Sequence, residues 1–190
     1  MIEIVEYREQ WPAEFRAIAG DLRRRLGPLA LRIDHIGSTS VPGLAAKDRI
    51  DIQVTVASAA DLDEAAALLA AAGYAARPAV RSDHVPPGGS AAPDEWSKRF
   101  LVQRAGERAA NIHIRVAGRA NQRYPLLFRD YLRAHPASAA AYAELKRRLA
   151  QNLADPGTYA DVKDPACDLI AVAAESWAAA SGWRPGPSDA

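Results

Sequence analysis

The sequence is poor in cysteine, in long apolar runs and in net charge, and each shortage narrows the range of functions. Cys167 is the only cysteine among 190 residues, which excludes an internal disulfide framework and a metal site built from several cysteines. No apolar run approaches the roughly 18 residues of a transmembrane helix. Residues 1–11 lack the basic and apolar regions of a signal peptide. We therefore expect a cytoplasmic protein without a membrane partner.

The positive and negative charges of the chain almost cancel. Lys and Arg number 24, Asp and Glu number 23, and the formal net charge is +1. Proteins that coat nucleic acid by bulk electrostatics carry a larger positive charge, so we do not expect a nucleic-acid partner. The length suits one domain, which we place at residues 1–180, followed by a flexible tail rich in Gly, Pro and Ser at residues 181–190. The sequence leaves the oligomeric state open.

The apolar pattern predicts strands mixed with helices first and helices alone afterwards. Residues 49–56 form the clearest strand, because apolar and polar residues alternate along their whole length. The other predicted strands are a short edge strand at 1–7 and the segments 31–36, 96–104 and 111–116. The predicted helices are 11–26, 58–73, 122–134, 137–153 and 159–180. This order indicates an α+β fold, with a mixed sheet of about five strands and a C-terminal helical segment packed against it. The Pro-rich and Gly-rich loop at 77–93 is either a mobile flap or a functional loop.

A loop rich in Gly, Ser and Thr between two predicted strands is the first candidate site. Gly37 lets backbone amides approach a ligand closely, and the hydroxyls of Ser38, Thr39 and Ser40 add hydrogen-bond donors. Lys47 lies at the end of the same stretch. Such loops suit phosphate oxygens, so we expect a nucleotide or another phosphate-bearing ligand here. The same composition also suits a tight turn that needs Gly and Pro only for its geometry.

Two predicted strands carry polar residues on one face. Asp51 lies on the polar face of strand 49–56, where a carboxylate can hold Mg²⁺, an ion that prefers oxygen ligands. Asn111, His113 and Arg115 alternate with apolar residues and therefore share one face, which would be rich in donors for an anionic ligand. Both faces could equally be the solvated side of a half-buried sheet.

The three C-terminal helices each carry a pair of side chains one helical turn apart. The pairs are Arg129 with Arg133, Tyr142 with Lys146, and Tyr159 with Lys163. Side chains at this spacing lie on one side of a helix. They either line one wall of a cleft, where they would position a substrate, or belong to ordinary helix surfaces.

Several of these stretches resemble the signatures of the GrpB family. The first is HIGSTSVPGLAAK at 35–47, and the second comprises LFRDYLRAHP at 127–136 and YAELK at 142–146. NIHI at 111–114 and the pair Tyr159 and Lys163 also match. The resemblance covers about residues 1–180. It implies a fold similar to that of the nucleotidyltransferase superfamily and relatives fused behind dephospho-coenzyme A kinase.

The chain departs from the superfamily pattern in its acidic residues. That pattern is a Gly-Ser pair, two Asp that flank an apolar residue, and a third carboxylate on a neighbouring strand. Gly37 and Ser38 match the pair and Asp51 matches the second Asp, but Arg49 stands in place of the first, and His113 lies on the strand of the third. The usual two-metal cage then cannot form. A single Mg²⁺ held by Asp51 and substrate phosphates, metal-free chemistry with His113 as acid or base, and no chemistry at all stay open.

The resemblance and the residues together suggest a nucleotidyltransferase-like transferase with Asp51 and His113 as its catalytic residues. The residues expected to position the second substrate are Arg115, Arg129, Arg133, Tyr142, Lys146 and Lys163. The alternative is a non-catalytic binding or helper module, related to the domain fused to the kinase. Transfer to a small amine or acid in the same cleft is a third possibility, and the sequence does not choose among these substrates.

Overall fold

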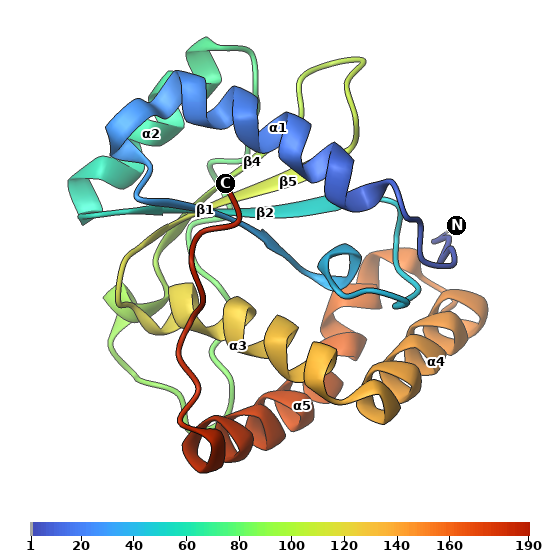
Figure 1. Cartoon of the computed structure of the whole chain (residues 1–190). Coiled ribbons are helices and arrows are strands. Elements are labelled where there is room, and N and C mark those ends of the chain that lie inside the picture. Colours follow the sequence, from blue (N-terminus) through green and yellow to red (C-terminus); the bar gives the residue numbers. More distant parts are fainter. Residues whose placement is uncertain (1) are drawn as a thin grey trace.

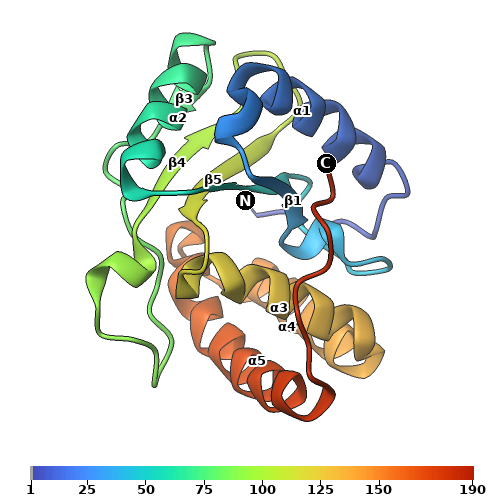
Figure 2. The same cartoon turned by 60° about the vertical axis from the view of Figure 1, so that its left-hand side comes forward.

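The computed structural model describes residues 2–190 and consists of one sheet with helices on both faces (Figure 1). Its helices are α1 (Trp11–Leu26), α2 (Ala59–Ala71), α3 (Ala120–Ala134), α4 (Pro136–Asn152) and α5 (Tyr159–Ser181). Its strands are β1 (Arg32–Ile36), β2 (Ile50–Val56), β3 (Ala75–Ala76), β4 (Lys98–Val102) and β5 (Ala110–Val116). Helices α1 and α2 cover one face of the sheet, and α3, α4 and α5 lie on the other (Figures 1 and 2).

The sheet is mixed, as predicted. Within residues 2–190 it has five strands in the order β1-β2-β5-β4-β3. Strands β2 and β5 run parallel, and the other neighbouring pairs are antiparallel. The register places Asp51 opposite Asn111 and Gln53 opposite His113. Residues with the same side-chain direction on these two central strands therefore lie next to each other.

The apolar face of the sheet forms the main core with α1 and α2. Alternate residues of β2 and β5 point to this side, and Ile52 and Ile112 have no exposed surface. Helix α1 starts at the predicted Trp11, and Phe15 packs into the same core. Helix α2 starts with a capping box: the Ser58 N–H donates to the Asp61 carboxylate, and the Asp61 N–H donates to the Ser58 hydroxyl. No helix within residues 2–190 combines the length and the apolar character needed to cross a membrane.

A second apolar cluster holds the C-terminal helices together and joins them to the loop after β1. Leu44 from that loop packs in one cluster with Leu127 of α3, Tyr142 of α4 and Ala174 of α5. The helices are thereby fixed below the polar face of the sheet without covering it completely. This arrangement leaves a cleft between the polar face and helices α3, α4 and α5.

The tail at 181–190, which we expect to be flexible, has hydrogen-bond partners in the structure. It runs from the end of α5 to the free edge of β1 (Figures 1 and 2). The Ser188 hydroxyl accepts a hydrogen bond from the backbone N–H of Ile33 at 2.9 Å, and the Ala190 N–H donates to the Ile33 carbonyl at 3.1 Å. An edge strand offers unpaired backbone groups, and these bind the tail. Composition alone could not show that such an edge lies within reach.

Candidate functional site

The loop after β1 brings a glycine against the carboxylate of β2. Gly37 has φ = 69°, a left-handed conformation that favours glycine. A Cβ built on Gly37 would lie only 2.5 Å from Asp51 Oδ2 and 2.9 Å from Asp51 Cβ. Glycine is therefore required at this position both by its backbone conformation and by its close approach to Asp51.

Two adjacent cavities meet at this glycine. We call the first the aromatic cavity, of about 250 Å³, because Trp96, Tyr124 and Phe128 line it. We call the second the lysine cavity, of about 280 Å³, because its lining includes Lys47, Lys146 and Lys163. The residues that line both cavities are Gly37, Ser38, Asp51, Tyr142 and Lys163. The predicted glycine bend and the predicted acid thus lie side by side where the two cavities join.

Asp51 is held in place by its partner on the parallel strand. Its Oδ1 accepts a hydrogen bond from Asn111 Nδ2 at 2.8 Å, and His113 Nε2 lies 4.0 Å from the same oxygen. The Asp51 side chain is 29% exposed, at the bottom of the cleft. Burial raises the pKa of the Asp51 carboxyl, although the Asn111 hydrogen bond and nearby cations act in the opposite direction. A carboxylate with a raised pKa is a better proton acceptor.

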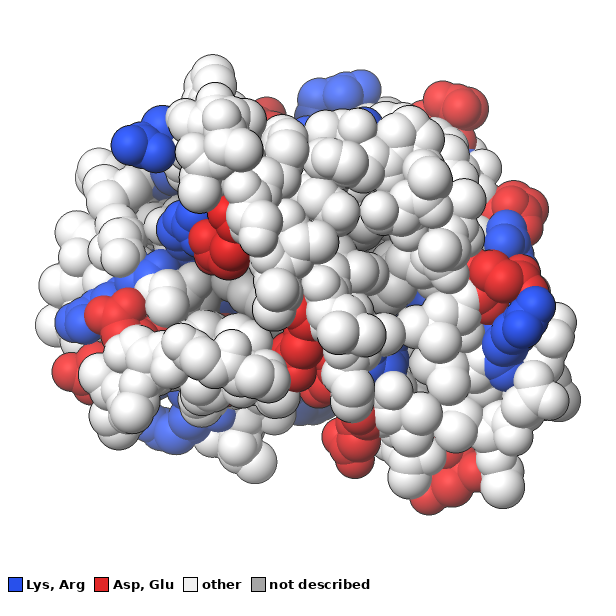
Figure 3. Space-filling view, turned by 90° about the horizontal axis from the view of Figure 1, so that it is seen from below, with Lys and Arg blue, Asp and Glu red and all other residues white. Residues whose placement is uncertain are grey.

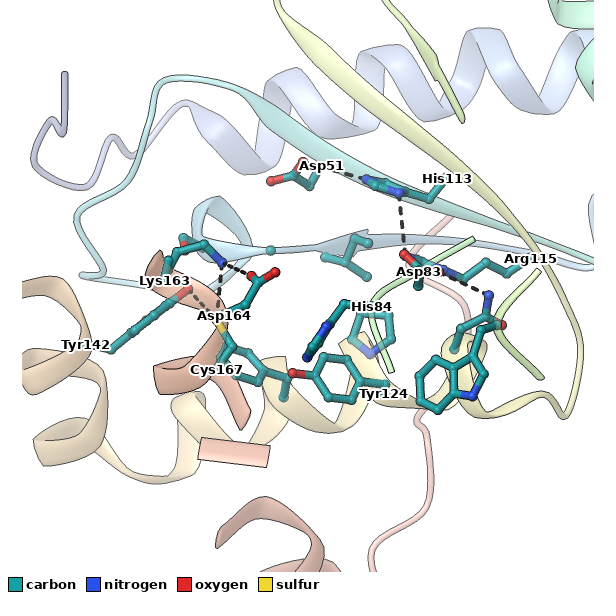
Figure 4. Close-up of a pocket in the computed structure, with 17 residues that line it drawn as sticks. Asp51, Asp83, His84, His113, Arg115, Tyr124, Tyr142, Lys163, Asp164 and Cys167 are labelled. Atoms are coloured by element: carbon teal, nitrogen blue, oxygen red, sulfur yellow. Dashed lines mark hydrogen bonds and ion pairs between the residues drawn. The ribbon is translucent and has the colours of Figure 1, made fainter. Parts of the chain in front are cut away.

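The tautomer of His113 follows from its neighbour Arg115. Arg115 Nη2 lies 3.4 Å from His113 Nδ1, and a guanidinium can only donate. Nδ1 is therefore the acceptor, and the ring proton sits on Nε2, which faces Asp51 (Figure 4). Burial, and then the positive charges of Arg115 and Lys98, lower the pKa of His113 well below its ordinary value. His113 is a neutral imidazole at physiological pH.

Three lysines surround the lysine cavity. Lys146 Nζ donates to Ser38 Oγ at 2.9 Å and also to the Ala45 carbonyl. Lys47 Nζ lies 3.8 Å from the centre of the Tyr159 ring, a cation–π contact. Burial, followed by repulsion from Lys163, lowers the pKa of Lys146 to about 7. Lys47 and Lys163 therefore supply the positive charge of this cavity, and the lowered pKa of Lys146 favours its uncharged amine beside the Ser38 hydroxyl.

Other residues of the predicted phosphate loop have structural partners. Thr39 lines the lysine cavity, but its buried hydroxyl lies 3.0 Å from Nε2 of His35. The Ser40 hydroxyl donates to the Gly37 carbonyl. These contacts shape the turn, and among the predicted hydroxyls Ser38 is the one that lines both cavities.

The structure places Arg129 and Arg133 outside both cavities, contrary to the expected positioning role. Arg129 is 4% exposed, and its Nη1 donates to the His35 carbonyl at 3.0 Å and to Asp189 Oδ2 at 2.7 Å. Arg133 donates to the Ser40 carbonyl at 2.7 Å and 3.1 Å. Helical spacing predicted that the two side chains share a face, but it could not show that this face meets β1 and the back of the loop.

Loop 77–93 contributes an acidic residue that the sequence did not indicate. Asp83 accepts hydrogen bonds from Arg115 Nε at 2.8 Å, from Lys98 Nζ at 2.6 Å and from Asn121 Nδ2 at 3.0 Å. Burial alone would raise the pKa of Asp83, but the two cations hold it below its ordinary value. Arg115 therefore lines the aromatic cavity with its charge already paired. From the same loop, His84 Nε2 lies 3.1 Å from the Asp168 carboxylate of α5.

The rarity of lysine relative to arginine in the sequence could have indicated which basic residues lie at the cleft. The chain has four lysines, and its other basic residues are arginines. Three of these lysines line the lysine cavity, and the fourth, Lys98, binds Asp83 in the wall of the aromatic cavity. Trp96, Tyr124 and Phe128 gave no comparable signal, because their spacing is that of ordinary packing residues.

The residues do not fit a two-metal centre. Among residues 2–190, no group of three or more His, Cys, Asp or Glu side chains is arranged to hold a metal ion. Asp51 is bordered by Asn111, neutral His113 and the lysines, which are donors or cations. Such a donor set lacks the several oxygen ligands that a pair of Mg²⁺ ions needs.

Comparison with known protein families shows to which family the chain belongs. The family described as GrpB protein matches residues 1–172. The chain belongs to the GrpB family. The crystal structure of the conserved protein GrpB from Enterococcus faecalis is 30% identical in sequence, with a TM-score of 0.72 over 92% of this chain and 99% of that one.

Other members of the GrpB family occur within longer proteins. A protein named dephospho-CoA kinase from Mycolicibacterium paratuberculosis is 38% identical over 202 residues, which cover 97% of this chain and 48% of the relative. The chain thus spans about half the length of such relatives. Cid1 in complex with its short product ApU has 17% identity and a TM-score of 0.51, over 77% of this chain and 43% of Cid1. This likeness shows a shared nucleotidyltransferase-like fold, which confirms the predicted α+β class.

Proposed function

We propose that this GrpB protein binds a nucleotide, or another phosphate-bearing ligand, across the two cavities and acts as a nucleotidyltransferase-like transferase. The observation that supports this most is the contact of Gly37 with Asp51. It puts an open backbone bend and an acid at the junction of a cationic cavity and an aromatic one. The nucleotidyltransferase-like fold of the chain is consistent with the proposal.

The lysine cavity would receive the phosphates. Lys47 and Lys163 supply positive charge, and Ser38 supplies a hydroxyl next to the glycine bend. Phosphate oxygens are strong acceptors for such donors. A single Mg²⁺ shared by Asp51 and the ligand phosphates remains part of the proposal, but no step below depends on it.

The aromatic cavity would receive the planar part of the ligand or a second substrate. Tyr124 and Phe128 of α3 stack with ring centres 6.0 Å apart, and Phe128 meets Tyr142 of α4 edge-on at 5.7 Å. All three rings line the aromatic cavity, and Tyr124 and Tyr142 lie across it from Asp51 and His113 (Figure 4). Aromatic walls favour flat rings, because stacking on them tolerates different bases.

Asp51 and His113 would handle the proton of an attacking hydroxyl. A hydroxyl at the junction of the cavities would lie beside Asp51, whose raised pKa suits it to accept a proton. His113 would hold Asp51 through its Nε2 proton, once the 4.0 Å gap closes around a ligand. Arg115 keeps that proton on Nε2 through its contact with Nδ1.

Isothermal titration calorimetry with the four nucleoside triphosphates, each with and without Mg²⁺, tests the proposal. We expect saturable binding that weakens about tenfold or more in Lys163→Met, a loss of about 1.4 kcal/mol. Arg148→Met, which removes an exposed cation from α4 far from the cavities, should bind like the wild type. No heat for any triphosphate, or an equal loss in both variants, would reject a nucleotide site in this cleft.

A second candidate is a helper module that binds a dephospho-CoA kinase. Two observations favour it: the chain matches about half of proteins with that name, and α5 exposes an apolar row. Val162, Leu169 and Val172 share one helical side, and Leu169 is 75% exposed. Figure 3 views the side on which α5 lies in Figure 1, and much of that face is uncharged. Such patches mark contact surfaces.

The two candidates respond to different substitutions. If the chain is a helper module, Leu169→Asp should abolish binding to a separately expressed dephospho-CoA kinase, measured by surface plasmon resonance, and Asp51→Ala should not. Leu68→Asp on α2 is the matched control, because Leu68 is also an exposed leucine. Binding that is absent in the wild type, or that survives Leu169→Asp, would reject this candidate.

A further inference from the structure

Ser38 and Lys146 form a side-chain pair at the junction of the two cavities. Lys146 Nζ lies 2.9 Å from Ser38 Oγ and also contacts the Ala45 carbonyl. Lys146 is 3% exposed, and among the described residues no carboxylate forms an ion pair with it. The charged group with the largest effect on it is another cation, Lys163.

These surroundings favour the uncharged form of the Lys146 amine. A buried ammonium without a counter-ion is costly and tends to lose its proton. Burial and Lys163 accordingly lower the pKa of Lys146 to about 7. A neutral amine can donate one N–H to the Ala45 carbonyl, and at 2.9 Å from Ser38 Oγ its nitrogen is close enough to accept the serine proton once the hydroxyl turns toward it.

A serine hydroxyl bonded to a neutral lysine is an activated nucleophile, as in Ser–Lys enzymes. We propose that Ser38 takes up the nucleotidyl group of a bound nucleoside triphosphate and that Lys146 accepts the serine proton. This inference rests on the proposed function of the cleft. Ser38 lines both cavities, so it borders both the expected phosphate site and the expected site of the second substrate.

The reaction has two balanced steps. In the first, a bond forms between Ser38 Oγ and the α-phosphorus, the bond from that phosphorus to the bridging oxygen of pyrophosphate breaks, and the serine proton moves to Lys146 Nζ. Pyrophosphate leaves with the electron pair of the broken bond. In the second, an acceptor hydroxyl attacks the same phosphorus and gives its proton to Asp51. The Ser38 oxygen leaves and recovers its proton from Lys146.

This route explains how transfer could proceed with Asp51 as the one acid among the described residues that line both cavities. Direct displacement in a two-metal centre relies on several carboxylates grouped around the ions, and residues 2–190 contain no group of three or more His, Cys, Asp or Glu arranged in that way. A covalent intermediate divides one difficult displacement into two easier ones. The lysines around the cavity would neutralise the charge of the departing pyrophosphate.

Exchange of labelled pyrophosphate into nucleoside triphosphates, without any acceptor, tests the first step in the full chain. We expect exchange with at least one of the four triphosphates. Intact-mass measurement should show an adduct of one nucleoside monophosphate less water, mapped to Ser38. Label at the α-phosphorus should stay with the protein, and label at the γ-phosphorus should not.

Substitutions separate the role of Lys146 as a base from its role as a cation. Ser38→Ala should abolish exchange and adduct. Lys146→Arg keeps a positive charge that cannot be removed, so binding in calorimetry should persist and exchange should fall about 100-fold. Lys146→Met, a second variant in case the arginine disturbs folding, should also lose exchange. Ser176→Ala on the exposed side of α5 should behave like the wild type. Thermal melting checks that each variant is folded.

Each result decides between the claims. Triphosphate binding without exchange or adduct would overturn the nucleophile and leave the proposed function standing. Exchange that persists in folded Lys146→Arg would overturn the role of Lys146. Absence of all nucleotide binding in the wild type would overturn both the nucleophile and the nucleotide site.

Discussion

On one face of β2 and β5, Ile52 and Ile112 are completely buried beneath α1 and α2. On the other face of the same strands, Asp51 and His113 border a cleft, with α3, α4 and α5 on its far side. Alternate residues of β2 and β5 thus build the hydrophobic core on one face of the sheet and the lining of the cleft on the other. The apolar face gains stability from burial, and the polar face keeps charged groups near one another at a cost in desolvation. Substitutions on the two faces should therefore have different effects on folding and on ligand binding.

The largest effect is expected on the apolar face. Ile112→Ala removes a fully buried side chain from the centre of the core, and such truncations lower the free energy of unfolding by about 2–5 kcal/mol. Urea unfolding followed by circular dichroism measures the loss. Ligand binding of the folded fraction should be unchanged, and a change in affinity without a change in stability would contradict the division between the faces.

A smaller loss is expected where the polar face meets the glycine bend. Gly37→Ala places a methyl group against Asp51 in a backbone conformation unfavourable for alanine, which we expect to cost about 1–3 kcal/mol and to abolish ligand binding. Gly43→Ala is the matched control, since Gly43 has φ = 75° and open space where a Cβ would lie. If both variants lose the same unfolding free energy and both still bind the ligand, the close approach of Gly37 to Asp51 contributes neither to stability nor to binding.

The next prediction concerns how the free energy of unfolding depends on pH through the titration of Lys146. Its pKa is about 7 in the folded protein and near its ordinary value of 10.5 in the unfolded chain. Between these values the unfolded chain binds a proton that the folded protein lacks, so stability should rise with pH by at most about 1.4 kcal/mol per unit. Lys146→Met should remove this rise. If the unfolding free energies of the wild type and of Lys146→Met change with pH in the same way, Lys146 keeps its proton in the folded protein and the prediction is wrong.

The smallest effect concerns the tail, far from the cleft. Asp189 accepts hydrogen bonds from Arg129 and from the His35 N–H, and it is partly exposed, so Asp189→Ala should cost about 1 kcal/mol. Thermal melting measures the change, with exposed Arg184→Ala as the control. A melting temperature equal to that of the wild type would mean that the tail does not stabilise the edge of β1.

The sequence predicted which face of a strand each side chain lies on better than it predicted which strands pair with one another. Alternation around Asp51 and His113 correctly put each on a polar face, and the helices and strands β1, β2, β4 and β5 lie close to their expected ranges. The strand expected at 1–7 is wrong for the described residues 2–7, where Val5 forms only an isolated bridge with Ala46, and β3 was not predicted. Alternation could not show that β2 pairs in parallel with β5, which is the pairing that brings Asp51 within 4.0 Å of His113. Strand pairing depends on tertiary packing, which local periodicity does not encode.

The sequence did not reveal which neighbouring element each side chain would meet, even where the spacing of residues along a helix was clear. Arg129 and Arg133 share a helical side, but that side meets main-chain carbonyls of the β1 segment and of the loop after it. Asp83 lies in a loop without periodicity, so no pattern could indicate that it would bind Arg115 and Lys98. Composition likewise could not show that the tail would meet an edge strand 155 residues earlier in the chain.

Amide chemical shifts of the full chain during titration with nucleoside triphosphates offer the most direct test of the cleft. If the bend beside Asp51 receives phosphate, the amide signals of Gly37 and Ser38 should move in a saturable way, while that of Gly182 at the end of α5 should stay in place. Unchanged Gly37 and Ser38 signals, with shifts elsewhere or none, would contradict the site at the junction of the two cavities.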